Sequence, residues 1–156
     1  MTTNTTLVFV YGTLLSGFSN NRLLARGGAQ CLGPASTRDA YTMLDLGAFP
    51  AVLATGRARY MAPVVGEVYE CTPDVLADLD ALEGYHGDAS GLYDRKPVQV
   101  QLDDGIITTA LIYVMHDSPR WRPNAPIVPE SDWCEWSNTC SEDEDPQPAG
   151  YVAEVA

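Results

Sequence analysis

Two segments that lie far apart in the sequence hold the residue types best suited to catalysis. The first, Tyr11-Gly12-Thr13-Leu14, directly follows the apolar run 7–10, so we expect a buried strand that ends in a glycine turn. Successive backbone N–H groups in such a turn can bind a carboxylate or a developing oxyanion, and glycine lets a ligand come close. An ordinary turn at the end of a strand is the alternative, because this short motif is a weak signal by itself.

The second segment ends a predicted helix, and its candidate residue is Glu83. Thr72-Pro73 is a typical helix start and Gly84 a typical stop, which predicts a helix over 72–83. The apolar stripe of this helix consists of Val75, Leu76, Leu79 and Leu82. Glu83 falls on the same side as that stripe. The alternative is that the helix frays at its end and that Glu83 simply pairs with a base such as Arg95.

A carboxyl group that faces the core at the end of a helix is expected to have a raised pKa. Burial disfavours the charged form, and the helix dipole disfavours negative charge at the C-terminal end. A raised pKa suits a group that takes up a proton and gives it back during a reaction. Glu83 is therefore the candidate general acid/base.

A hairpin further along the chain holds the candidate substrate-binding side chains. Residues 93–102 and 106–115 alternate in polarity and flank an Asp-Gly turn, which predicts two paired strands. Tyr93 and Arg95 would share one face and could orient a substrate carboxylate; a surface pair is the alternative. Tyr113, on the partner strand, is a further candidate, although such a tyrosine is more often a core residue.

The sequence offers no familiar metal, nucleotide or covalent site. Its two histidines are far apart and none of its four cysteines forms a Cys-x-x-Cys pair, which argues against zinc. Glycine-rich phosphate loops and the Gly-x-Ser-x-Gly nucleophile motif are absent. We therefore expect no metal, no cofactor and no covalent intermediate. Cys134 and Cys140 could pair under oxidising conditions, but we expect free thiols, as in a cytoplasmic protein.

Length and charge narrow the class of protein further. The 156 residues fit one domain, and the net charge of -12 is uneven: residues 123–156 hold eight acidic residues and no basic one. We expect no basic surface for nucleic acid, no membrane span and no secretory signal. We expect a cytoplasmic monomer with a flexible N-terminus at 1–6, a folded domain at 7–137 and a disordered acidic tail at 138–156.

The pattern of elements predicts an α+β fold. Strands are expected at 7–11, 29–37, 40–46, 52–53 and 64–71 besides the hairpin, and a short helix at 21–26 is stopped by two glycines. Many strands, few helices and no regular alternation of the two favour a small, mixed, curved sheet or barrel with one main helix. A tight turn is expected at 47–50.

Taken together, these motifs resemble the gamma-glutamylcyclotransferase-like family, which includes gamma-glutamylamine cyclotransferases and AIG2-like proteins. The matching segments are Val10-Tyr11-Gly12-Thr13-Leu14, Gly47-Ala48-Phe49-Pro50, Gly66-Glu67-Val68-Tyr69, Leu79-Asp80-Ala81-Leu82-Glu83-Gly84-Tyr85 and Tyr93-Asp94-Arg95. They span roughly residues 7–115 in the right order and spacing. The region from Pro119 onward has no counterpart that we can assign.

The resemblance implies a small barrel with a pocket at its mouth and a metal-free enzyme. It implies that the turn at 11–14 binds a gamma-glutamyl group and that Glu83 is the general acid/base. The substrate's own alpha-amine would attack its gamma-carbonyl, releasing 5-oxoproline and an amine or amino acid. The leaving group stays open. A non-catalytic binding module on the same fold, or an enzyme for another small molecule in the same pocket, is the alternative.

Overall fold

The computed structural model describes residues 4–46, 49–53, 61–83, 85, 93–115, 126–128 and 131–137. Eight strands and three helices are described in this part of the chain. In chain order they are β1 (Thr6–Val10), α1 (Asn21–Arg26), β2 (Gln30–Tyr41), β3 (Met43–Asp45), β4 (Pro50–Val52), β5 (Ala62–Cys71), α2 (Pro73–Glu83), β6 (Tyr93–Leu102), β7 (Ile107–Met115), β8 (Ile127–Val128) and α3 (Trp133–Ser137).

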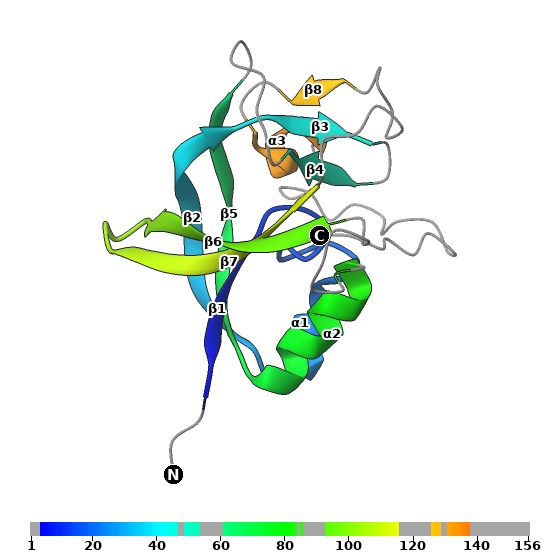
Figure 1. Ribbon diagram of the computed structural model, residues 1–156, viewed down its shortest axis with the longest axis vertical. Helices are drawn as coiled ribbons and strands as arrows, with labels where there is room; N and C mark the ends of the chain where they lie inside the picture. The colour runs from blue at the N-terminus through cyan, green and yellow to red at the C-terminus, as the bar shows by residue number, and fades with distance from the viewer. Residues whose placement is uncertain are drawn as a thin grey trace.

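Five strands close into a barrel in the order β1-β5-β2-β6-β7 (Figure 1). Strand β1 runs antiparallel to β5 and parallel to β7, which it meets where Val8 pairs with Leu111. The other neighbours in the barrel are antiparallel. This arrangement confirms the predicted small mixed barrel, in which α2 is the longest helix of the described residues. Each barrel strand has a neighbour on both sides, although β2 meets β6 only over Ala35–Thr37 and β1 meets β7 only at Val8.

A small second sheet, in the order β4-β3-β8, lies at one end of the barrel (Figure 1). Its β3-β4 hairpin is closed by a hydrogen bond from the Leu46 N–H to the Phe49 carbonyl at 3.0 Å, as expected for a turn at 47–50; residues 47 and 48 themselves lie outside the described part. A bridge between Leu53 and Met115 joins this sheet to the end of β7.

The main helix, α2, forms where the sequence predicts it. Thr72 caps its start: the Thr72 hydroxyl accepts a hydrogen bond from the Val75 N–H at 3.4 Å, and its carbonyl accepts one from the Leu76 N–H at 2.9 Å. The fully buried residues are Val75, Leu79 and Glu83, spaced four apart. One face of the helix therefore enters the core, and its last member is a carboxyl group.

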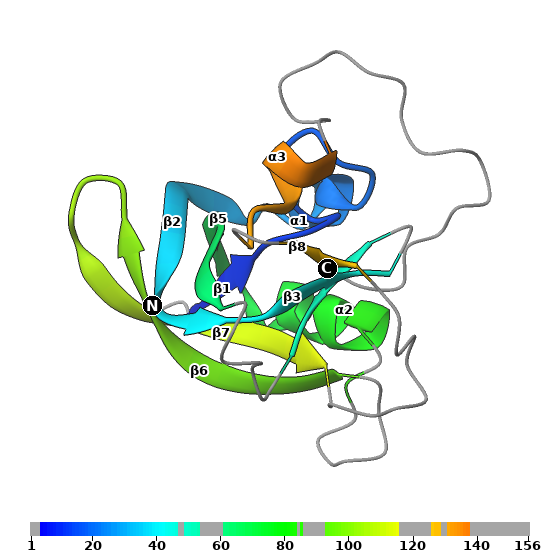
Figure 2. The ribbon, with the colours of Figure 1, turned by 90° about the horizontal axis from the view of Figure 1, so that it is seen from above.

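The short helix α1 packs beside α2 (Figures 1 and 2). It spans Asn21–Arg26, as predicted, and Gly27 ends it. A Cβ atom at Gly27 would overlap Val75 Cγ2. The glycine thus leaves room for the Val75 side chain where the two helices pack together.

The two strands predicted at 29–37 and 40–46 are divided differently. Strand β2 continues through the expected break to Tyr41, and β3 follows at Met43. The pairing register with β5 shifts between Ser36 and Ala40. At that point the Thr37 hydroxyl accepts a hydrogen bond from the Val64 N–H at 2.8 Å and donates one to the Asp39 carbonyl at 2.6 Å. These two hydrogen bonds keep β2 continuous across the register shift, at the point where the sequence pattern predicts a gap between two strands.

The cysteines are of three kinds. Cys71 is a buried free thiol and Cys31 is an exposed free thiol. Cys134 is disulfide-bonded, so the expectation of a free thiol there is wrong. Its partner lies outside the described residues, as do Cys140 and the predicted acidic tail.

None of the helices in the described part of the chain is long and apolar enough to cross a bilayer.

Candidate functional site

Glu83 lies at the C-terminal end of α2 with 1% of its surface exposed. Its charge contributes to raising the pKa of both Tyr11 and Tyr113. The Glu83 carboxyl group of α2, the Tyr11 hydroxyl directly after β1 and the Tyr113 hydroxyl of β7 are all buried, and the carboxyl group interacts electrostatically with both hydroxyls. The structure thus brings together three of the residues that the sequence analysis selects.

The Tyr11 side chain ties the end of β1 to two other strands. Its hydroxyl donates a hydrogen bond to the Tyr113 carbonyl at 2.8 Å and accepts one from the Val52 N–H at 3.4 Å. Burial, followed by the nearby charge of Glu83, raises the pKa of Tyr11 well above its ordinary value, although the Val52 N–H lowers it in part. Tyr11 is therefore a neutral phenol that fixes the start of the turn.

Three hydrogen bonds hold the turn after β1 in place. The Leu15 N–H donates to the Gly12 carbonyl at 3.0 Å, and the Asn20 N–H donates to the Thr13 carbonyl at 2.9 Å. The Asn20 amide also donates to the buried Thr13 hydroxyl at 3.0 Å. Among the turn and loop hydrogen bonds between backbone groups of the described residues, none is donated by the N–H groups of Gly12 and Leu14, which are buried residues. Buried backbone donors of this kind are expected to meet a ligand or water.

Asp80, one turn before Glu83 on α2, joins two further candidates. The Tyr113 hydroxyl donates to Asp80 Oδ1 at 2.7 Å, and Arg95 Nη1 lies 2.6 Å from Oδ2 and 2.8 Å from Oδ1. The Arg95 guanidinium also stacks on the Tyr85 ring, 4.7 Å from its centroid. Arg95 therefore pairs with Asp80, and the alternative in which Arg95 neutralises Glu83 is wrong.

The electrostatics of this group follow from the same contacts. Burial raises the pKa of Tyr113 strongly, and the hydrogen bond to Asp80 together with the charges of Asp80 and Glu83 raises it further, while Arg95 lowers it in part. Burial lowers the pKa of Arg95, but the charge and hydrogen bonds of Asp80 outweigh this effect, so that the net shift is upward. Tyr113 stays protonated and Arg95 stays charged at neutral pH.

Tyr93 and Arg95 hydrogen-bond to different elements. Tyr93 is fully buried, and its hydroxyl donates to the Pro50 carbonyl of β4 at 3.4 Å. Arg95 reaches α2 instead, with about a quarter of its side chain exposed. Tyr93 thus braces the small sheet against the barrel, and Arg95 lies nearer the surface.

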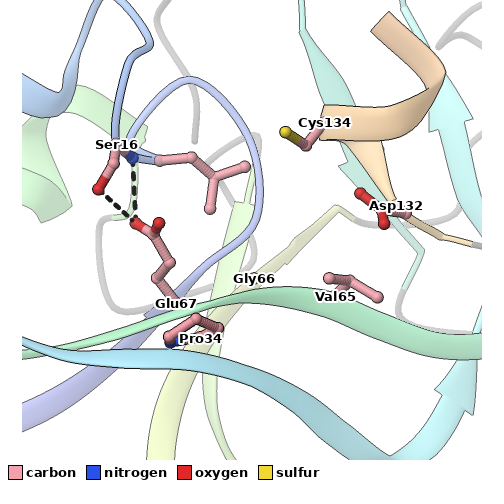
Figure 3. Close-up of a pocket in the computed structure, with 8 residues that line it drawn as sticks. Ser16, Pro34, Val65, Gly66, Glu67, Asp132 and Cys134 are labelled. Atoms are coloured by element: carbon pink, nitrogen blue, oxygen red, sulfur yellow. Dashed lines mark hydrogen bonds between the residues drawn. The ribbon is translucent and has the colours of Figure 1, made fainter. Parts of the chain in front are cut away.

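A cavity of about 360 Å³ opens on the outer side of β5, between the segment after the turn and α3 (Figure 3). Leu15, Ser16, Pro34, Val65, Gly66, Glu67, Asp132 and Cys134 line it. Glu67 Oε1 accepts hydrogen bonds from the Ser16 N–H at 3.0 Å, from the Ser16 hydroxyl at 3.1 Å and from the Tyr69 hydroxyl at 3.1 Å. Glu67 therefore anchors the segment that follows the turn at 11–14 to the barrel.

Sequence reasoning missed two residues of this site. Asp80 is not among the candidates selected from the sequence, yet it lies three residues before Glu83 and so on the same side of the helix; that spacing was the available signal. Asn20 directly precedes α1, but its side chain makes no capping bond and donates a hydrogen bond to Thr13 instead. No local pattern reveals that contact.

Within the described residues, no group of three or more His, Cys, Asp or Glu side chains is arranged to hold a metal ion.

Comparison with known proteins gives a consistent result. The family model "Gamma-glutamyl cyclotransferase, AIG2-like" matches residues 8–135, which extends beyond residue 115, where the sequence resemblance was expected to end. A Vibrio cholerae protein named "Putative gamma-glutamylcyclotransferase" is 34% identical over 129 residues, covering 83% of this chain and 96% of its own. A similarly named protein from Methanocaldococcus jannaschii is 34% identical over 111 residues, covering 71% of this chain and 85% of its own.

Solved structures agree with the sequence relatives. The crystal structure of an AIG2-like protein from Mus musculus superimposes with a TM-score of 0.67 at 25% identity, covering 83% of this chain and 89% of that one. The same barrel is therefore found in a structure of that family. The chain belongs to the AIG2-like gamma-glutamyl cyclotransferase family.

Proposed function

We propose that this protein is a gamma-glutamyl cyclotransferase that converts a gamma-glutamyl compound into 5-oxoproline and a free amine or amino acid. The observation that carries the proposal is the buried carboxyl group of Glu83, which shares its environment with Tyr11 and Tyr113 at the turn after β1. The family membership supports the substrate class.

The first half of the reaction is an intramolecular attack. Glu83 takes a proton from the substrate's alpha-ammonium group, and the resulting amine nitrogen forms a bond to the gamma-carbonyl carbon. The electron pair of the carbonyl bond moves to its oxygen, which becomes an oxyanion. Because nucleophile and electrophile belong to one molecule, the protein contributes mainly by holding the substrate in a folded conformation.

The second half breaks the original amide bond. The oxyanion re-forms the carbonyl, and the bond from the gamma-carbon to the leaving nitrogen breaks. Glu83 returns its proton to that nitrogen as the bond breaks, and its carboxylate is regenerated. The ring nitrogen still holds two hydrogens at this stage. The Glu83 carboxylate takes one of them and passes it to the departing amine, so 5-oxoproline leaves with a single N–H and the amine leaves as its ammonium form.

We assign the turn at 11–14 to the gamma-glutamyl group. The buried N–H groups of Gly12 and Leu14 are suited to a carboxylate or to the developing oxyanion, and Thr13 and Tyr11 fix the turn around them. Tyr113 would contact the substrate near Glu83. Arg95 would act at the surface-facing side, and Tyr93 would hold the adjoining strand β4 in place.

The experiment that tests this proposal is a release assay on a panel of gamma-glutamyl compounds. Glutathione, gamma-glutamyl amino acids, an epsilon-(gamma-glutamyl)lysine isopeptide and simple gamma-glutamylamines are incubated with the full chain, and 5-oxoproline and the free amine are quantified by mass spectrometry. We expect equal amounts of both products from at least one compound, which then identifies the leaving group. Absence of 5-oxoproline from every compound, with a folded protein, would favour a binding module or another substrate class.

A further inference from the structure

Asp80 is the shared acceptor for two side chains of the β6-β7 hairpin, Tyr113 and Arg95. It receives the hydrogen of the Tyr113 hydroxyl at 2.7 Å and the guanidinium of Arg95 at 2.6 and 2.8 Å. Both Asp80 and Glu83 influence the Tyr113 hydroxyl electrostatically. Since the two acids are three residues apart on α2, they are neighbours on one side of the helix.

A count of hydrogens shows what Asp80 does to the tyrosines. A phenol has one hydrogen, and that of Tyr113 is donated to Asp80. The single hydrogen of Tyr11 is donated to the Tyr113 carbonyl. Both phenol oxygens that share the environment of Glu83 therefore direct their hydrogens to other acceptors.

The destination of those hydrogens matters for proton transfer. An O–H donor or a guanidinium directed at a carboxylate stabilises its charged form and lowers its pKa, by about 1 to 3 units for a close arginine. A carboxylate stabilised in this way is a weaker base toward an ammonium group. Asp80 binds two groups of the described residues that could have this effect, Tyr113 from β7 and Arg95 from β6.

We propose that Asp80 is a positioning residue for Glu83, in that it binds the Tyr113 hydrogen and the Arg95 guanidinium and so keeps both directed away from that carboxyl group. The proposal rests on the proton-transfer role proposed above for Glu83. Among the described residues, the charged and titratable groups that act on Glu83 in this account are Tyr11 directly after β1, Tyr113 from β7, Asp80 from α2 itself and, through Asp80, Arg95 from β6.

The test is a direct titration of the Glu83 carboxyl carbon by NMR in protein labelled with ¹³C-glutamate. The Glu83 signal is assigned by its absence from Glu83→Gln. Asp80→Asn, which keeps the shape and loses the charge, is expected to lower the Glu83 midpoint by about one unit or more. Asp78→Asn is the matched control, because Asp78 is an exposed acid on the same helix; its expected effect is a few tenths of a unit.

The charge of Asp80 also acts through space, so a double-mutant cycle is needed to separate that effect from the release of Arg95. Arg95→Gln should change the Glu83 midpoint little when Asp80 is present. In the Asp80→Asn background, Arg95→Gln should raise the Glu83 midpoint most of the way back to its wild-type value. The reason is that Arg95 is then the group that has turned toward Glu83. Equal effects of Arg95→Gln in both backgrounds, or an Asp80→Asn shift no larger than that of Asp78→Asn, would overturn the proposal.

The titration needs no turnover, so it separates this proposal from the proposed function. A coupled shift without any 5-oxoproline release would support the positioning role of Asp80 and contradict the enzyme. Release of 5-oxoproline that depends on Glu83, without a coupled shift of its midpoint, would support the enzyme and contradict the positioning role of Asp80. Should Asp80→Asn fail to fold by circular dichroism, Asp80→Ser, which cannot reach both partners, takes its place with the same expectations.

Discussion

Burial raises the pKa of the Cys71 thiol and of several tyrosine hydroxyls in the core of this small barrel. Burial, followed by the neighbouring charge of Glu70, raises the pKa of Cys71 from 9.0 to about 11. Burial is likewise the largest cause that raises the pKa of Tyr69 from 10.0 to about 12. The pKa values of Tyr11 and Tyr113 are also raised. The folded state thus keeps protons that the unfolded chain loses.

This difference predicts a loss of stability in alkali. Where the folded state binds more protons than the unfolded state, the free energy of unfolding falls as pH rises. It should be insensitive to these groups below pH 9, begin to fall as an unfolded Cys71 would ionise, and fall more steeply between pH 10 and 12 as the tyrosines follow. Urea unfolding at a series of pH values measures it.

A variant identifies the groups responsible. Cys71→Ala removes the thiol and should flatten the dependence between pH 9 and 10, whereas Cys31→Ala, which removes an exposed free thiol, should not. A free energy of unfolding that rises across this range in the wild type would contradict the assignment.

At the scale of elements, the site depends on how closely β5 approaches the end of β1. A Cβ atom at Gly66 would overlap the Val10 carbonyl, which is backbone and leads directly into the turn at 11–14. A Cβ atom at Gly27 would overlap Val75 Cγ2, the end of a side chain that can rotate. The two glycines therefore allow close packing against neighbours of very different rigidity.

Gly66→Ala is expected to destabilise the protein by about 1–3 kcal/mol, because strand backbone must move to admit the methyl group. Gly27→Ala is the matched control and should cost less than about 1 kcal/mol, since a rotamer change relieves the contact and alanine favours the folded helix end. Urea unfolding of both variants checks the order. Equal losses, or a larger loss for Gly27→Ala, would show that the β1–β5 contact is not the constraint.

Elements with strong local signals were predictable from the sequence, and their long-range contacts were not. The Thr72-Pro73 start, the spacing of Val75 and Leu79 and the glycine stop together define α2, and that spacing also places Glu83 on the buried face. By contrast, the continuity of β2 depends on the bonds that Thr37 makes with Val64 and Asp39. A local sequence pattern does not indicate which distant residue will bond to Thr37.

At the scale of the whole molecule, barrel closure creates the site. Tyr11 and Tyr113 are 102 residues apart, and they meet because β1 lies beside β7. The hairpin and both of its strands could be predicted, but the register that directs Arg95 and Tyr113 to Asp80 follows from closure of the barrel and from the position of α2 on it. The family resemblance supplied the order of the motifs, whereas the choice of partner for Arg95 had to come from the structure.

The central claim is that Glu83 carries protons in a cyclisation that releases 5-oxoproline, and one measurement tests it most directly. The rate of 5-oxoproline release from the best compound of the panel is measured for the wild type, for Glu83→Gln and for Glu135→Gln, which makes the same change at an exposed residue. We predict that Glu83→Gln lowers kcat by about 10²- to 10⁴-fold while the folded protein still binds substrate, and that Glu135→Gln matches the wild type. A folded Glu83→Gln protein with kcat close to that of the wild type would contradict the account.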